Sequence, residues 1–150
     1  MERSLVLIKP DAIQRGLTGT IITRLEKQRL KVVALKMLHL DKALAQRHYA
    51  VHSDKPFFDS LVNYISSTPI IAIIFESKSA VEVARKTMGA TDPAKADAGT
   101  IRGDFGLDIE RNTVHGSDSV ETAKEEIRLF FSEDEIFSYD REINSWVTET

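Results

Sequence analysis

The chain has 150 residues, of which 42% are hydrophobic and 29% charged, and its formal net charge is −3. A chain of this length and composition buries a core without disulfides or metals, so we expect residues 1–150 to form a single domain. The slightly acidic balance excludes the positive surface that holds nucleic acid or an anionic membrane, and no apolar run reaches the roughly 20 residues of a membrane span. Cysteine is absent, which excludes disulfides and thiolate chemistry. We expect a cytoplasmic protein with no specific nucleic acid and no membrane partner.

Strands and helices alternate in the first ninety residues. Apolar, β-branched runs predict three strands, over residues 4–9, 31–40 and 69–77. Helical spacing of apolar residues predicts four helices, over residues 18–28, 42–49, 55–67 and 80–88. Pro10 and Asp11 end the first strand in a turn, Pro56 stands near the first turn of the third helix, and Gly89 ends the fourth.

Residues 90–112 have no sustained periodicity, and an unstructured segment of this length inside a compact domain is usually functional. A short strand over residues 113–115 and a helix follow, with Asp118 as the predicted N-cap and Glu121 at the capping-box position. This order predicts an α+β, ferredoxin-like fold, which is an antiparallel four-stranded sheet (βαββαβ) covered by helices, with a long loop at about 90–112. A doubly wound parallel sheet is the alternative, but its usual glycine-rich first turn is missing.

The segment "RNTVHGSDS" places one histidine, His115, between an apolar residue and a polar turn. A nucleophile is one interpretation: neutral imidazole is available near pH 7, Gly116 leaves room for an incoming phosphate, and the next helix aims its N–H groups there. Glu126 could hold the other ring nitrogen. A Ser/His/Asp triad is disfavoured, because triad members rarely adjoin in sequence and no G-x-S-x-G elbow occurs. On local sequence alone, a structural His115 is still the more common case.

Two further groups of residues are candidates for binding a metal ion or a polyphosphate. His48 and His52 are four residues apart and would share a face of a continuous helix, as metal ligands do, but no third ligand at a suitable spacing is evident. Donor types that suit a polyphosphate stand at Lys9, Arg85, Thr91 and Arg102. Each of these alone is more typical of solvated surface. No P-loop and no G-x-G-x-x-G motif occurs, so any nucleotide must be held in another way.

Taken together, the stretches "IKPDAIQRG", "HYAVHSDKPFF", "GATDP", "GTIRGDFG" and "RNTVHGSDS" closely resemble the nucleoside diphosphate kinase family over essentially the whole chain. The resemblance implies an enzyme that transfers the γ-phosphate of a nucleoside triphosphate, usually ATP, to a nucleoside diphosphate and so maintains triphosphate pools. It implies a ping-pong mechanism through a phosphohistidine on Nδ1 of His115. Mg²⁺ would be held mainly by the nucleotide phosphates, with no direct protein ligand.

The resemblance also implies roles around the reacting phosphate. Glu126 would orient His115, and Lys9 and Tyr49 would act near the phosphate and the sugar. The residues that would support the histidine and the start of the next helix are Gly116, Ser117 and Asp118.

The nucleotide-binding residues implied by the resemblance are Lys9, Phe57, Arg85, Thr91, Arg102, Ile109 and Asn112. Phe57 would stack on the base, with Ile109 on the other side where the family usually has Val. Asn112 would contact the ribose hydroxyls together with Lys9. A base held mainly by stacking predicts broad tolerance of the nucleobase.

Four positions depart from the common family pattern: Ala12 replaces Gly, Lys55 replaces Arg, Asp92 replaces Asn and Ala98 replaces Pro. None removes a catalytic group, but the changes at Lys55 and Ala98 bear on loop rigidity and assembly. The resemblance implies a homo-oligomer, either tetramer or hexamer. The ending "SWVTE", with the single tryptophan Trp146, resembles the hexameric type, so a hexamer is favoured and the tail is expected to dock.

Two alternative functions belong to other classes of protein. One is an interaction or regulatory module that kept the fold and lost the activity, although a decayed site would be expected to have lost some of the polar residues named above. The other is a metal-dependent hydrolase that uses His48 and His52.

Overall fold

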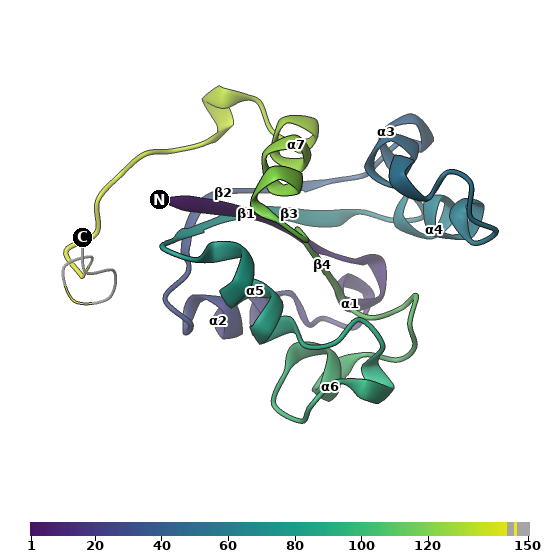
Figure 1. Ribbon diagram of the computed structural model, residues 1–150, viewed down its shortest axis with the longest axis horizontal. Helices are drawn as coiled ribbons and strands as arrows, with labels where there is room; N and C mark the ends of the chain where they lie inside the picture. The colour runs from purple at the N-terminus through teal and green to yellow at the C-terminus, as the bar shows by residue number, and fades with distance from the viewer. Residues whose placement is uncertain (144–145, 147–150) are drawn as a thin grey trace.

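The computed structural model describes residues 1–143 and residue 146, and its central feature is one antiparallel sheet (Figure 1). The sheet has the strand order β2-β3-β1-β4. Its strands are β1 (Glu2–Ile8), β2 (Lys31–Leu38), β3 (Ile70–Ser77) and β4 (Val114–Gly116). The helices are α1 (Pro10–Gln14), α2 (Thr18–Glu26), α3 (Lys42–His48), α4 (Phe58–Ile65), α5 (Ala80–Met88), α6 (Ile101–Phe105) and α7 (Val120–Phe130), and the short 3₁₀ helices are η1 (Ala50–His52), η2 (Pro93–Lys95) and η3 (Glu133–Glu135).

This topology confirms the predicted α+β, ferredoxin-like arrangement. β1 pairs antiparallel with β3 on one side and with β4 on the other, where Leu7 lies opposite His115. β2 pairs antiparallel with β3. The alternative of a doubly wound parallel sheet is therefore wrong. No helix in the described part of the chain is both long enough and apolar enough to cross a membrane.

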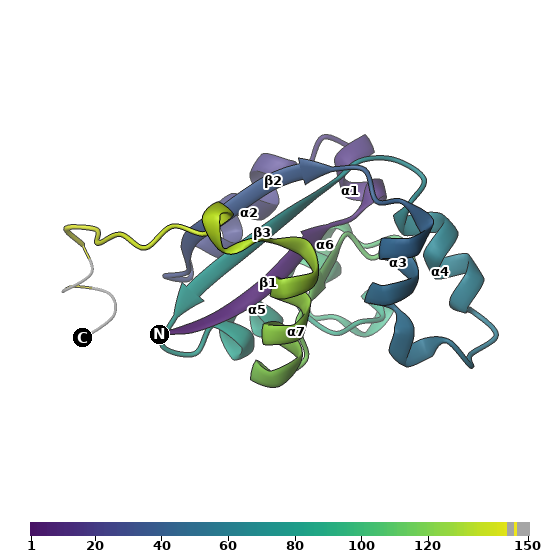
Figure 2. The same cartoon turned by 90° about the horizontal axis from the view of Figure 1, so that it is seen from above.

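Helices cover both faces of the sheet. Along β1, Leu5 and Leu7 pack with α3, α4 and α7, whereas Val6 and Ile8 pack with α1, α2, α5 and α6. Because successive residues of a strand point to opposite faces, coverage of both faces requires an apolar residue at every position. This explains the continuous apolar runs of the central strands. Figures 1 and 2 both show α3 and α4 next to each other at the end of the sheet where β1 leads into α1.

The segment predicted as a long unstructured loop contains two short helices, so that prediction is wrong in part. The side chain of Asp92 accepts a hydrogen bond from the N–H of Ala94 at 3.0 Å at the start of η2. Thr100 caps α6 by accepting from the N–H of Gly103 at 3.0 Å. Both elements are too short to produce a detectable apolar period. A third short helix, α1, replaces the turn predicted after Lys9.

The N-cap of α7 is Ser119, not the predicted Asp118. Ser119 has the extended backbone of an N-cap, with φ −151° and ψ 169°, and its side chain accepts from the N–H of Thr122. The carboxylate of Asp118 binds Arg85 instead, at 2.6 Å. Of the two adjacent capping residues, Ser119 therefore caps α7 and Asp118 contacts α5.

Candidate active site

A cavity of about 1020 Å³ opens beside β4, and its lining includes all but one of the predicted site residues. The predicted residues that line it are Lys9, Tyr49, Phe57, Arg85, Thr91, Arg102, Ile109, Asn112, His115, Gly116, Asp118 and Glu126. Ser117 is the exception, because it is fully buried and hydrogen bonded to Glu126. The fold therefore brings together side chains that are spread over more than a hundred residues of sequence.

His115 is held by a chain of hydrogen bonds that begins at the central strand. The N–H of Leu5 donates to Ser117 Oγ at 3.1 Å, and this hydroxyl donates to Glu126 Oε1 at 2.7 Å. The other carboxylate oxygen, Oε2, lies 2.9 Å from His115 Nε2. Since a carboxylate only accepts, the neutral ring must carry its proton on Nε2. The lone pair is then on Nδ1, the nitrogen suited to nucleophilic attack.

The turn that leads into β4 has an unusual backbone. Thr113 has a positive φ of 73°, and the N–H of Val114 donates to the carbonyl of Asn112 at 2.9 Å, which closes a γ-turn. A β-branched residue in this region costs roughly 1–3 kcal/mol. The N–H of Lys9 donates to the carbonyl of Thr113 at 2.9 Å and holds the turn against the end of β1. This turn places Asn112 beside Lys9. It also places His115, two residues after Thr113, within β4.

Two buried cations face the cavity. Lys9 Nζ donates to Asn112 Oδ1 at 2.8 Å, and Asn112 Nδ2 in turn donates to the carbonyl of Thr91 at 2.8 Å. The guanidinium of Arg102 donates to the carbonyls of Gly89 and Val114, at 2.9 and 2.8 Å.

Neither cation forms an ion pair with a described carboxylate. Burial, reinforced by the charge of Arg102, lowers the pKa of Lys9 to about 8. Burial and the charge of Arg85 lower the pKa of Arg102 to about 10. Buried cations without an anionic partner are costly, and they are typical of sites that bind an anion.

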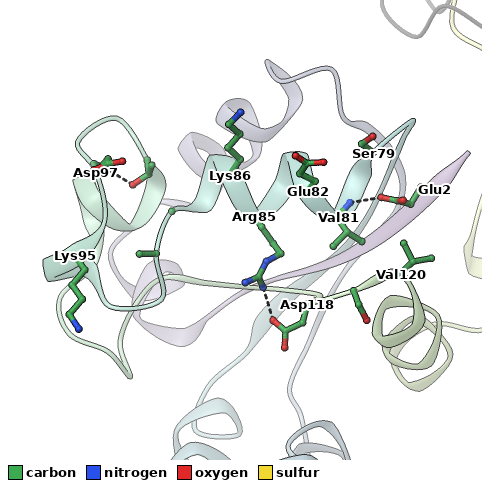
Figure 3. A pocket seen from close by; sticks show the side chains of 14 residues that line it. Glu2, Ser79, Val81, Glu82, Arg85, Lys86, Lys95, Asp97, Asp118 and Val120 are labelled. Carbon is green, nitrogen blue, oxygen red and sulfur yellow. Dashed lines mark hydrogen bonds and ion pairs between the residues drawn. The ribbon is translucent and has the colours of Figure 1, made fainter.

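Arg85 and Asp118 form an ion pair at the edge of this site (Figure 3). Arg85 Nη1 lies 2.6 Å from Asp118 Oδ1, and the two side chains are 47% and 78% exposed. Both residues also line a second cavity, of about 810 Å³, which runs along α5 from the start of α7 to the segment before α6. Figure 3 shows the pair crossing the space between α5 and the segment before α7. An exposed pair of this kind is weak, so Arg85 can exchange Asp118 for another anion.

Apolar and aromatic side chains line another part of the cavity. Phe57 and Ile109 are 46% and 63% exposed, although both are large apolar residues. They come from segments that are far apart in sequence and line the same cavity. Tyr49 is buried next to His48, and burial raises the pKa of its phenol well above the usual range, so the hydroxyl stays protonated.

The structure contradicts two of the local interpretations made from sequence. α3 ends at His48, so His48 and His52 do not share a continuous helix. In place of a triad, Ser117 and Asp118 bind Glu126 and Arg85. At Gly116 a Cβ would lie 2.0 Å from Cε of Met88. Gly116 allows α5 to pack closely on β4.

The sequence analysis did not predict that His48 lies next to His115. Its ring centroid lies 4.6 Å from that of His115, with an interplanar angle of 83°, and its side chain is only 1% exposed. It also packs on Phe130 of α7, at a centroid distance of 5.3 Å. The apolar residues that follow helical spacing in α7 could have indicated that a neighbouring helix is buried against it, but not which of its residues meets His115.

Comparison with known proteins agrees with this geometry. The family model described as nucleoside diphosphate kinase matches residues 2–136. Nucleoside diphosphate kinases of Dehalococcoides mccartyi and Archaeoglobus fulgidus are similar to the chain. The first is 60% identical over 141 residues, which is 94% of this chain and 99% of that protein. The second is 53% identical over 149 residues, which is 99% of each.

Two solved structures are also similar. A halophilic nucleoside diphosphate kinase from Halobacterium salinarum, in complex with CDP, superposes with a TM-score of 0.95 at 49% identity and covers 97% of each chain. A nucleoside diphosphate kinase family protein from Babesia bovis has a TM-score of 0.95 at 40% identity and covers 98% of this chain and 99% of its own. The chain therefore belongs to the nucleoside diphosphate kinase family of enzymes.

Proposed function

We propose that the protein transfers the terminal phosphate of a nucleoside triphosphate, usually ATP, to a nucleoside diphosphate by a ping-pong mechanism, and so maintains nucleoside triphosphate pools. The hydrogen bond between His115 Nε2 and Glu126, 2.9 Å long, is the observation that carries the proposal. It fixes the tautomer in which Nδ1 is free to attack, in a cavity that also contains the buried cations Lys9 and Arg102.

The first half-reaction forms a bond between His115 Nδ1 and the γ-phosphorus. The bond from this phosphorus to the bridging oxygen breaks, and its electron pair leaves with the nucleoside diphosphate. The proton on Nε2 stays in its hydrogen bond to Glu126, whose negative charge stabilises the positive charge that develops on the ring. In the second half-reaction a terminal oxygen of another nucleoside diphosphate attacks the phosphorus of the phosphohistidine, and the bond from phosphorus to His115 Nδ1 breaks, with its electron pair returning to Nδ1. Both halves use the same site, since they are the same reaction in opposite directions.

The cations of the cavity stabilise the transferring phosphate. We assign the phosphate contacts to Arg85, Thr91 and Arg102, with Lys9 and Tyr49 near the reacting phosphate and the sugar. Arg102 is held rigidly by two carbonyls, whereas Arg85 leaves Asp118 to bind phosphate. Phosphoryl transfer depends mainly on such charge stabilisation and positioning.

The base and the ribose are held by different chemistry. We assign the base to the space between Phe57 and Ile109, and the ribose hydroxyls to Asn112 and Lys9, which already bind each other at 2.8 Å. Stacking uses a π-face that every nucleobase has, so it discriminates little between bases. Relative efficiencies across purine and pyrimidine diphosphates test this, and a preference of several orders of magnitude for one base would contradict it.

Mg²⁺ fits this cavity as an ion brought by the nucleotide. Mg²⁺ prefers an octahedron of oxygen ligands, which phosphates and water supply. In the described part of the chain, the one group of three potential metal ligands within reach of one another contains two histidines, which suits Mg²⁺ poorly. We therefore propose that phosphate oxygens hold the ion, and that Asp118, released from Arg85, offers its exposed carboxylate to the ion's water shell. When bound, Mg²⁺ neutralises charge on the phosphates.

We also propose that residues 1–150 act as one domain in a homo-oligomer, a hexamer rather than a tetramer. Trp146 is 84% exposed in the single chain, which supports docking of the tail on another subunit. The other residues of the ending, 145 and 147–149, lie outside the described residues. Light scattering at several protein concentrations distinguishes the two assemblies, and a monomeric mass would contradict both. The cytoplasmic location stays a prediction.

Incubation with γ-labelled ATP tests the proposed mechanism. The protein should acquire label that is stable in alkali and labile in acid, and an added nucleoside diphosphate should remove it as a triphosphate. His115→Ala should abolish labelling and turnover while nucleotide affinity stays within a few-fold, because the imidazole acts in the chemical step. An unlabelled protein would refute the phosphohistidine and favour the regulatory module. Release of free phosphate without labelling would favour the metal-dependent hydrolase.

A further inference from the structure

His48 is a buried histidine of the cavity to which the proposed phosphoryl transfer gives no role. Its side chain is 1% exposed, and neither ring nitrogen has a hydrogen-bond partner among the described residues. Buried polar atoms normally have partners, so two such atoms on one ring point to a ligand.

Potential ligand atoms of three residues lie close together around His48. His48 Nδ1 lies 3.7 Å from Glu126 Oε2, which in turn lies 2.9 Å from His115 Nε2. One ligand atom from each of these three residues lies within 4.8 Å of the other two, and within residues 1–143 and 146 no other three such residues meet in this way. Tetrahedral Zn²⁺ binds nitrogen and oxygen at about 2.0–2.2 Å, so its ligands lie roughly 3.3–3.6 Å apart. The two separations to Glu126, 3.7 and 2.9 Å, lie within about 0.4 Å of this range.

We propose that His48, His115 and Glu126 form an inhibitory site for a transition-metal ion of the Zn²⁺ type. Two imidazoles and one carboxylate are a common ligand set for zinc, and imidazole also suits cobalt and copper but not Mg²⁺. All three residues line the cavity of about 1020 Å³, so the ion enters through the same opening as the nucleotide, and water from the cavity supplies the fourth ligand. Ser117 continues to hold the other oxygen of Glu126, at 2.7 Å.

Metal binding to His115 Nε2 and phosphoryl transfer to His115 Nδ1 exclude each other, because each requires the single ring proton to be on the other nitrogen. A metal ion on Nε2 of His115 displaces the proton that now bonds Glu126, and the neutral ring then carries its proton on Nδ1. Nδ1 has no lone pair in that tautomer and cannot attack phosphorus. The proton moves from one ring nitrogen to the other through solvent, and no proton is released overall. This inhibitory consequence rests on the proposed function, whereas the metal site itself does not.

Metal binding to the nucleotide-free protein tests the site directly. Titration with Co²⁺ should give the visible absorption of a tetrahedral ion, with one ion per chain, and Zn²⁺ should displace it. His48→Gln should weaken binding of either ion at least about tenfold, as loss of a ligand or of its support does. The matched control is His52→Gln, because His52 lines the same cavity but lies outside the group of three. Its metal affinity should be unchanged.

Three results would overturn the metal site. They are equal affinity of His48→Gln and the unsubstituted protein, equal losses in the two histidine variants, and a cobalt spectrum typical of six oxygen ligands. If His48→Gln fails to fold, Glu126→Gln and the anomalous scattering of zinc in crystals of the unsubstituted protein locate the ion instead. An anomalous peak away from His48 would also refute the proposal.

Phosphoenzyme formation separates this proposal from the proposed function. Prior incubation with Zn²⁺ should suppress labelling by γ-labelled MgATP, and a zinc-selective chelator should restore it. In His48→Gln, half-suppression should need at least about tenfold more Zn²⁺. If the zinc-free protein is never labelled, the kinase mechanism fails while the cobalt titration still tests the metal site. If Zn²⁺ binds at His48 and labelling is unaffected, the inhibitory part of the proposal is wrong.

Discussion

The substitution Glu126→Gln should slow phosphorylation of His115 without weakening nucleotide binding. Glu126 accepts two hydrogen bonds, from Ser117 at 2.7 Å and from His115 at 2.9 Å. A glutamine has one carbonyl oxygen, so when Ser117 donates to it the amide NH₂ faces the ring. That NH₂ donates, which forces the His115 proton onto Nδ1 and removes the nucleophilic lone pair.

The size of the effect follows from the interaction that is lost. Glu126 is only 11% exposed, and a hydrogen bond to a charged group is worth about 1.5–3 kcal/mol. Each 1.36 kcal/mol changes a rate about tenfold, so phosphorylation should be roughly 10- to 150-fold slower. The loss should occur in the rate of a single turnover, because Glu126 contributes through the ring and not through the nucleotide.

Rapid-quench measurement with γ-labelled ATP separates the rate from the affinity. Glu125→Gln is the matched control, since Glu125 is the adjacent carboxylate of α7, also lines the cavity and forms no described ion pair. This control should phosphorylate at close to the rate of the unsubstituted protein. A Glu126→Gln rate within about threefold of that rate would refute the tautomer argument, as would an equal slowing in both variants.

Three other substitutions probe separate parts of the site. Gly116→Ala should lower the free energy of unfolding by about 1 kcal/mol in urea titrations, because the new Cβ would lie 2.0 Å from Cε of Met88, the end of a flexible side chain that must shift. Its loss should be smaller in a Met88→Ala background, and simple additivity would contradict the packing argument. Asp118→Asn should free Arg85 and, in nucleotide titrations without Mg²⁺, tighten triphosphate binding by up to about fivefold, since an exposed pair is worth at most about 1 kcal/mol. Weaker binding would show that Asp118 positions Arg85 productively. Burial lowers the pKa of Lys9 to about 8, so its ammonium is charged below that pH and neutral above it. Nucleotide affinity should therefore fall as pH rises through about 8, and Lys9→Met should be weaker throughout and lack this transition.

The sheet could be predicted because its residues follow rules that act locally. The run 69–77 differs from the observed β3 (Ile70–Ser77) by one residue, since strands buried on both faces are apolar throughout. The segments that the sequence analysis missed or misplaced are short or depend on distant contacts. η2 and α6 have three and five residues, which is less than two helical turns. At the start of α7 the sequence offers two adjacent capping residues, and Ser119 is the N-cap while Asp118 pairs with Arg85.

The polar residues of the site could be predicted by type but not by position. Sequence shows that Lys9 and Arg102 are suitable phosphate donors, but their convergence depends on the fold and on the γ-turn at Thr113. A positive φ at a threonine has no signal in one sequence. The burial of His48 could not be predicted from the sequence either, because it depends on how α3 packs against Phe130 of α7.

The attachment of His115 to β1 determines which component moves during the reaction: the nucleotides move, and the histidine stays in place. His115 pairs with Leu7 on β1, and its carboxylate partner is tied through Ser117 to the backbone of Leu5. The imidazole is therefore tied to β1 although β4 is an edge strand, and the phosphate it accepts is held at one place in the cavity. Donor and acceptor must enter in turn and place their terminal phosphates at that point. Each turnover then consists of the release of one nucleotide and the binding of another, and no mobile segment has to carry the phosphoryl group between two sites.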